Sequence, residues 1–181
     1  MDNARARFDE QVLPHLDAAY RFARWLARSP ADADDIVQES MLRAFRGFAG
    51  LKGSDAKGWL LAIVRNCHLT AVAQRARRPL VPLPEEGDSC AGELLVSTAE
   101  GPEAAALAGD ASRTLERLVA ALAEQHREVL ILREIEELDY RDIAKVLEIP
   151  IGTVMSRLAR ARAALRARWL DESEGASHAV R

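Results

Sequence analysis

A run of arginines near the C-terminus is the stretch of this chain with the clearest chemistry. The segment 151–170 holds five arginines and no acidic residue: Arg157, Arg160, Arg162, Arg166 and Arg168. Such a density of like charge repels itself on an isolated helix, and a polyanion relieves the repulsion. Arginine pairs bidentately with guanine or with phosphate, and Ser and Thr contact either at shorter reach. The segment therefore has the chemistry of a surface that binds DNA.

Two helices are needed to position these arginines, and the apolar residues predict both. Ile143, Val146 and Leu147 share one face of a short first helix, which Asp139 can cap. After Pro150, which suits the entry to a helix, apolar residues recur at i, i+4, i+7 and i+11 in a second helix. They are Val154, Leu158, Ala161 and Leu165.

The polar residues of the second helix point away from its apolar stripe. A step of about 100° per residue puts Thr153, Ser156 and Arg160 nearly opposite the stripe, with Arg157 on its flank. Two short helices about a tight turn, the second rich in arginine, are typical of a DNA-reading helix-turn-helix. The alternative is that the arginines only complement the helix dipole on a solvated surface, and it explains less of this context.

Two blocks of sequence carry a family resemblance. LDYRDIAKVLE followed by IPIGTVMSRLARAR resembles the promoter-reading region of bacterial RNA polymerase sigma factors of the extracytoplasmic-function group. ADADDIVQESMLRAFRGF, and after it GWLLAIVRNCHLTAVAQRARR, is similar to the region of the same group that binds core polymerase and reads the −10 element. The resemblance implies an all-α fold in which two small helical domains are joined by a flexible acidic linker.

Charge and composition place the boundaries between these parts. We expect the first domain at 1–78, the linker at 79–110, the helix-turn-helix domain at 111–170 and a tail at 171–181. The linker carries seven acidic residues and no Lys or Arg, and its Pro and Gly content predicts no core of its own. It is either a solvated spacer or, as the resemblance allows, an acidic strand that occupies a basic channel of the polymerase.

Three helices are expected in the first domain. Apolar residues repeat at helical spacing from Phe8 to Leu26, and Ser29-Pro30 ends that run. A second helix begins at about Asp32. Ser54 or Asp55 caps a third helix that carries Trp59 and ends in a basic cluster before Pro79.

The resemblance implies a role for particular residues of both domains. Core polymerase, through its β′ clamp helices, is expected to contact Asp35, Gln38 and Glu39. The −10 element is expected to contact Trp59, Asn66, Arg75, Arg77 and Arg78. The −35 element is expected to contact Thr153, Met155, Ser156, Arg157 and Arg160. Trp59 is either a stacking platform for a base or a core residue, and its place in the apolar period favours the core.

Two residues depart from the pattern of the group. Glu148 stands in the turn where glycine is frequent, which costs on the order of 1 kcal/mol if the residue must be left-handed. Met155 stands where many relatives have a cation, so the −35 sequence that this chain reads is not implied by the resemblance.

Neither catalysis nor a metal or other cofactor is expected. Cys67 and Cys90 form no CxxC pair, and the chain has no glycine-rich phosphate loop or HExxH motif. It has no apolar segment of signal-peptide or transmembrane length, and two scattered cysteines suit a reducing interior. We therefore expect a cytoplasmic protein without membrane insertion, monomeric when free.

The predicted function is initiation of transcription at specific promoters. The implied partners are core RNA polymerase (its β′ clamp helices and β flap), promoter DNA and an anti-sigma factor. Residues 1–78 have 13 basic and 9 acidic side chains and residues 111–170 have 11 and 9, so neither domain is strongly basic and the free protein should bind promoters weakly.

Two other functions stay open. A stand-alone helix-turn-helix regulator would leave residues 31–78 unexplained. A sigma mimic that titrates an anti-sigma factor would not need the arginines of the second helix.

Overall fold

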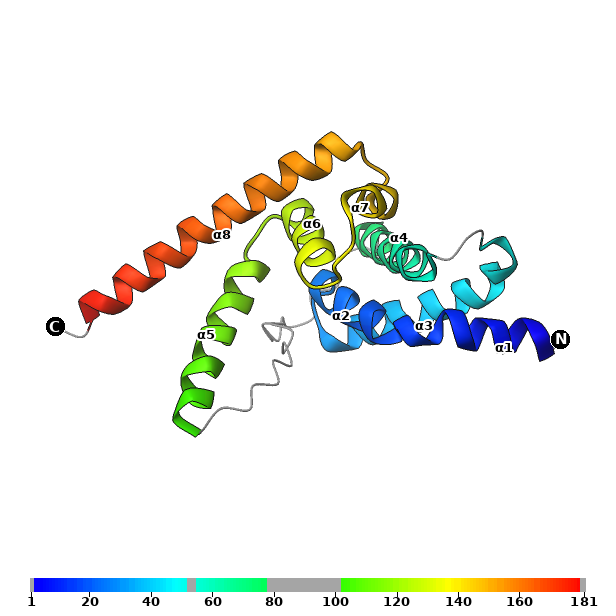
Figure 1. Cartoon of the computed structure of the whole chain (residues 1–181), viewed down its shortest axis with the longest axis horizontal. Helices are drawn as coiled ribbons and strands as arrows, with labels where there is room; N and C mark the ends of the chain where they lie inside the picture. Colours follow the sequence, from blue (N-terminus) through cyan, green and yellow to red (C-terminus); the bar gives the residue numbers. More distant parts are fainter. Residues whose placement is uncertain (1, 52–54, 78–101, 180–181) are drawn as a thin grey trace.

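A computed structural model describes the backbone of residues 2–51, 55–77 and 102–179, and the side chains within 4–51, 55–77 and 111–172. Over these ranges the elements are α-helices and short 3-10 helices, and none is a strand, which confirms the all-α prediction (Figure 1). No helix in this described part is long and apolar enough to cross a membrane.

The first domain packs α2, α3 and α4 around one core. The elements are α1 (Asp2–Gln11), η1 (Leu13–His15), α2 (Leu16–Leu26), α3 (Pro30–Gly47), η2 (Phe48–Gly50) and α4 (Ala56–Arg77). Phe22, Leu60 and Leu61 are fully buried at its centre. The single helical run expected from Phe8 to Leu26 was wrong, because it is divided between α1 and α2. The division falls at η1, where Pro14 lacks the N–H that a continuous helix needs.

The starts of α3 and α4 follow from their capping residues. Ser29 Oγ accepts a hydrogen bond from the Asp32 amide at 3.1 Å, so α3 begins at Pro30 rather than at about Asp32. Asp55 Oδ1 accepts from the Gly58 amide at 2.9 Å, which makes Asp55 a cap of α4. Ser54 lies outside the described residues.

The second domain contains the predicted pair of helices. Its elements are α5 (Pro102–Ala120), α6 (Glu124–Glu134), α7 (Tyr140–Leu147) and α8 (Ile151–Ala179). Ile143 and Leu147 of α7 are buried against Val154 and Leu158 of α8, as the apolar spacing predicted. Asp139 caps α7 through a 2.8 Å bond from the Asp142 amide, and this bond holds the pKa of Asp139 below its ordinary value.

Both ends of this domain are more helical than expected. The start of α5 at Pro102 lies inside the stretch 79–110 assigned to the linker, and the alanine-rich sequence there favours a helix. Helix α8 continues to Ala179, through most of the expected tail (Figure 1). Arg117 of α5 donates to Glu172 of α8 at 2.8 and 3.0 Å, which joins the two helices beyond the helix-turn-helix.

The two domains also pack on one another. Helix α4 lies against α7, and α2 lies against α6 (Figure 1). The helix-turn-helix is thus seated on the same helices that build the first domain.

Glu148 provides a test of backbone strain in the turn between α7 and α8. Its φ and ψ are 53° and 43°, the left-handed region in which a side chain is unfavourable. We expect Glu148→Gly to raise the free energy of unfolding by about 1 kcal/mol, measured by urea denaturation. Glu148→Ala is the matched control, because it removes the carboxylate and keeps the Cβ. Equal effects of the two substitutions would contradict the strain.

Candidate nucleic-acid and protein interfaces

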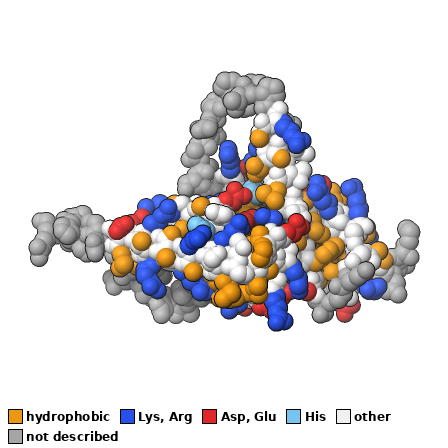
Figure 2. Space-filling model, turned by 90° about the horizontal axis from the view of Figure 1, so that it is seen from above, with side chains coloured by type: hydrophobic (Ala, Val, Ile, Leu, Met, Phe, Trp, Pro, Cys, Tyr) orange, Lys and Arg blue, Asp and Glu red, His pale blue; other side chains and the backbone are white. Residues whose placement is uncertain are grey.

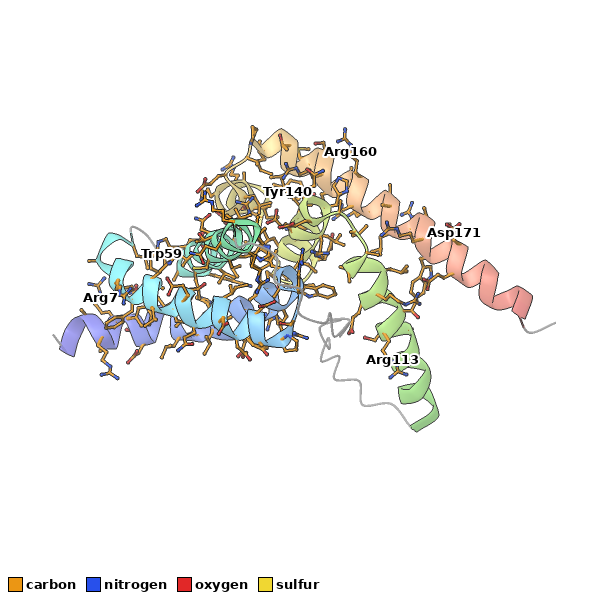
Figure 3. The ribbon with its side chains drawn as sticks, turned by 180° about the vertical axis from the view of Figure 1, so that it is seen from behind. Arg7, Trp59, Arg113, Tyr140, Arg160 and Asp171 are labelled. Atoms are coloured by element: carbon orange, nitrogen blue, oxygen red, sulfur yellow. The ribbon has the colours of Figure 1, made fainter. Side chains whose placement is uncertain are left out.

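The first turns of α8 present the residues expected to read duplex DNA. Met155 is 54% exposed, Ser156 and Arg160 are exposed, and Thr153 and Arg157 are half-buried. Arg160 lies on the outer side of α8 (Figure 3). The exposure of this side follows from the burial of Val154, Leu158 and Ala161, which leaves the opposite side of the helix in solvent. The structure therefore brings these five residues together at one end of α8.

The arginines of α8 do not all belong to this surface. Arg162 donates its Nε–H to Glu134 of α6 at 3.0 Å, and this hydrogen bond raises the pKa of Arg162. It therefore links two helices of the second domain. Basic, acidic and apolar side chains are interspersed on the face shown in Figure 2, which fits the modest net charge of each domain.

Three of the residues expected to contact a melted strand share one side of α4. Trp59, Asn66 and Arg77 fall within about 20° of one another around the helix axis, given about 100° per residue. Asn66 and Arg77 are exposed. Trp59 is half-buried and packs against the core. A Cβ added at Gly47 would lie 3.7 Å from Cζ2 of its ring. The ring therefore supports the helix that carries Asn66.

The basic cluster at the end of α4 is only partly available for phosphate. Arg75 forms an ion pair with Asp32 at the start of α3, so it ties the two helices together. Arg77 is exposed, and Arg78 lies outside the described residues.

Helix α3 carries the residues expected to bind core polymerase. Asp35 and Gln38 are exposed, and Glu39 is half-buried and pairs with Arg43 at 2.6 Å. The spacing i, i+3, i+4 makes them one patch on the helix.

Two large apolar residues of α3 stay outside the core. Phe45 is 54% exposed, and its ring touches Phe8 edge-on at a centroid distance of 5.2 Å. Leu42 is 46% exposed and was not singled out from the sequence. Leu42 lies four residues after Gln38 and three residues before Phe45, so helical periodicity places it on the same side of α3 as both. This spacing could have predicted its exposure.

A cluster of charged side chains lies between the two domains, and no pattern in the sequence predicted it. Glu136, in the α6–α7 connection, has a fully buried side chain. Arg21 of α2 donates to both of its carboxylate oxygens at 3.0 and 3.1 Å, and Lys57 Nζ of α4 lies 3.1 Å from Oε2. Lys57 also donates to the Glu136 carbonyl oxygen at 2.7 Å.

Two further pairs extend this contact along α4. Arg65 donates to Glu128 at 2.9 Å, and His68 Nε2 lies 3.1 Å from an oxygen of Glu124. Burial raises the pKa of Glu128, and Arg65 offsets that effect only in part. The pair is therefore held in place at a cost in desolvation.

Comparison with known proteins gives the same two regions in the same order. Residues 12–78 match the family Sigma-70 region 2, and residues 112–165 match the family Sigma-70, region 4.

Among curated proteins, the RNA polymerase sigma-H factor of Pseudomonas aeruginosa is 35% identical over 137 residues, which cover 74% of this chain and 71% of that protein. The ECF RNA polymerase sigma factor SigW of Bacillus subtilis is 31% identical over 169 residues, which cover 91% and 89%. The ECF RNA polymerase sigma factor SigE of Mycolicibacterium smegmatis is 33% identical over 165 residues, and this match spans 62% of its length.

Two solved structures share the fold. The sigma factor RpoE of Bartonella quintana, in complex with the anti-sigma factor NepR, has a TM-score of 0.68 and 24% identity, with 90% of this chain and 96% of that one covered. CnrH, in complex with the cytosolic domain of CnrY, has a TM-score of 0.61 and 25% identity, with coverage of 93% and 90%.

Proposed function

This chain belongs to the extracytoplasmic-function group of the sigma-70 family, a family of promoter-specific transcription initiation factors, and we propose how its two domains divide that task. Residues 1–78 bind core RNA polymerase and open and read the −10 element, and residues 111–170 read the −35 element. The observation that supports the proposal is the exposure of at least two expected contact residues on each helix, while other residues of the same helix are buried in the core. They are Asp35 and Gln38 on α3, Asn66 and Arg77 on α4, and Ser156 and Arg160 on α8.

The polymerase-binding surface is the patch on α3. Asp35, Gln38 and Glu39 supply acceptors and an amide to the β′ clamp helices, and the β flap holds the second domain. The polymerase supplies the phosphodiester chemistry, so the chain needs no catalytic residue, metal or other cofactor of its own. It acts in the cytoplasm, where the polymerase and the promoters are, without insertion into a membrane and as a monomer when free.

The −10 surface is the exposed side of α4. A melted base is held by contacts to its edge and by stacking beside positive charge. In this scheme Asn66 contacts the base, Arg77 and Arg78 contact phosphate, and Trp59 supports the helix from its half-buried position. Arg75 reaches phosphate only if it leaves Asp32.

The −35 surface is the start of α8, inserted into the major groove. Arg157 and Arg160 reach guanine edges or phosphates, and Thr153 and Ser156 make shorter contacts. Met155 offers an apolar contact, which suits a thymine methyl group.

An anti-sigma factor is proposed as the regulator. RpoE of Bartonella quintana, whose fold this chain shares, is bound by the anti-sigma factor NepR. A partner of the same class would hold the two domains of this chain away from polymerase.

Run-off transcription with purified core polymerase on a genomic promoter library tests the function. With this protein added, transcript starts should appear that share a two-part upstream motif. Binding to core without new starts would favour a sigma mimic. Binding to duplex DNA without core, again without new starts, would favour a stand-alone regulator.

The −35 contact can be tested at Arg160. We expect Arg160→Ala to lower run-off transcription by about 5-fold to 150-fold, because one bidentate contact to a base is worth about 1–3 kcal/mol. Arg162→Ala is the matched control, since Arg162 lies on the same helix and pairs with Glu134. Binding to core should be unchanged in both variants. An equal loss of transcription in both would contradict the assignment of Arg160.

The polymerase contact can be tested at Asp35. Asp35→Arg removes an acceptor and inserts a bulky cation, so it should weaken binding to core about tenfold or more, measured by fluorescence titration. Asp34→Arg is the control, because Asp34 is also exposed but lies about 100° away around α3. Core binding that is unaffected by Asp35→Arg would remove α3 from the interface.

A further inference from the structure

We propose that a cleft beside the end of α2 binds a small phosphorylated molecule that also has an apolar part, of which a mononucleotide is the simplest example. The cleft is formed by the end of α2, the second half of α4 and the junction of α5 with α6. Neither promoter contact nor polymerase binding requires such a site, so the inference goes beyond the proposed function.

The size and lining of the cleft suit a small ligand. Its volume of about 300 Å³ is at the lower end of the range for ligand pockets, about 300–1,000 Å³. Its lining is half apolar and half ionisable, which fits a ligand with one apolar part and one charged group. The apolar members are Trp25, Leu26, Ala27, Val72 and Ala120, and the ionisable members are Arg28, His68, Arg75, Glu124 and Arg127.

Positive charge exceeds negative charge in this lining. Three arginines share the cleft with one carboxylate, that of Glu124. An oxygen of Glu124 lies 3.1 Å from Nε2 of His68, so this carboxylate already has a partner. Arg28 and Arg127 form no ion pair within the part of the chain that the structure describes. The cleft is therefore short of an anion.

Arg127 is the arginine for which this shortage costs most. Its side chain is half-buried, and Nη1 donates to the Ala120 carbonyl at 2.7 Å. The Nε–H is buried and meets no acceptor among the described residues. Burial lowers the pKa of Arg127, and the charges of Glu124 and Glu128 offset this effect only in part. An anion beside the guanidinium would stabilise its charged form.

Arg28 supplies a second guanidinium from a fixed backbone. The Ala27 amide donates to the Ala23 carbonyl at 2.8 Å, and Ser29 caps α3, so the chain is anchored on both sides of Arg28. Its side chain is exposed. A phosphate group has three acceptor oxygens, so one phosphate between Arg28 and Arg127 would pair with both guanidinium groups. A carboxylate has only two oxygens and satisfies fewer donors, which favours phosphate as the anion.

The α4 side of the cleft is not the side proposed for the −10 element. His68, Val72 and Arg75 recur at i, i+4 and i+7, so they share one side of the helix. At about 100° per residue they lie roughly opposite Asn66 and Arg77. Val72 is 44% exposed and offers apolar surface to the ligand. A ligand in the cleft therefore leaves the −10 side of α4 open.

Calorimetric titration of the full chain with AMP tests the site. We expect saturable binding of one AMP per chain, with inorganic phosphate and adenosine each at least about tenfold weaker, because each supplies half of the contacts. Absence of saturable AMP binding would overturn the proposal. Inorganic phosphate that binds as tightly as AMP would overturn the apolar half of it.

Arg28→Gln tests the phosphate contact. Loss of one charge-assisted contact should weaken AMP binding about tenfold or more, and the exposed side chain has no internal partner whose loss would disturb the fold. Arg46→Gln is the matched control, because Arg46 is an exposed arginine of α3 outside the cleft, and it should keep the wild-type affinity. Equal weakening in both variants would indicate general attraction of anions and would overturn the site.

Val72→Asp tests the apolar part of the lining. A carboxylate at this position should repel the phosphate and abolish AMP binding. Leu69→Asp is the control, since Leu69 is 39% exposed on the same helix but outside the cleft. Circular dichroism should show the same helical content in both variants, and a folded Val72→Asp variant that still binds AMP would overturn the proposal. These titrations need no polymerase or promoter, so their outcome is independent of the run-off test.

Discussion

The burial of an apolar stripe on α3, α4 and α8 is the constraint on which the functional surfaces of this structure depend. In α8, burial of Val154 and Leu158 leaves Ser156 and Arg160 in solvent. The same rule places Asn66 on the open side of α4 and the acidic patch on the open side of α3. Since a helix has a fixed period, the residues that build the core also determine which side chains are offered to DNA or polymerase.

Charge is distributed so that attraction within the protein competes with attraction for its partners. The glutamates of α6 and of the α6–α7 connection neutralise Arg21, Lys57 and Arg65 of the first domain. These cations are paired with carboxylates while the domains are docked, which lowers the general affinity of the free protein for DNA. Weak binding by the free protein is thus consistent with its net charge and with its internal pairing.

Local features of the structure were predictable from the sequence, and contacts between distant residues were not. The two helices of the helix-turn-helix, the cap at Asp139 and the left-handed Glu148 follow from patterns within a few residues. The division of the first helix could also be predicted, since Pro14 lies within the apolar run and lacks the N–H that a continuous helix needs. Arg21 and Glu136 are 115 residues apart, and no periodicity relates them, so only the folded chain reveals their pairing.

The length of the connection between the domains fits both a docked and a separated arrangement. Residues 78–101 join the end of α4 to the start of α5, and 25 peptide steps span at most about 80–90 Å when fully extended. This reach is close to the roughly 85 Å that about 25 base pairs of B-form DNA span from the −10 to the −35 element, so the chain is long enough for both domains to bind one promoter. A covalent connection between two domains also raises the effective concentration of each near the other. A modest interface is therefore enough to keep them docked, and a partner that separates them must bind tightly or at more than one surface.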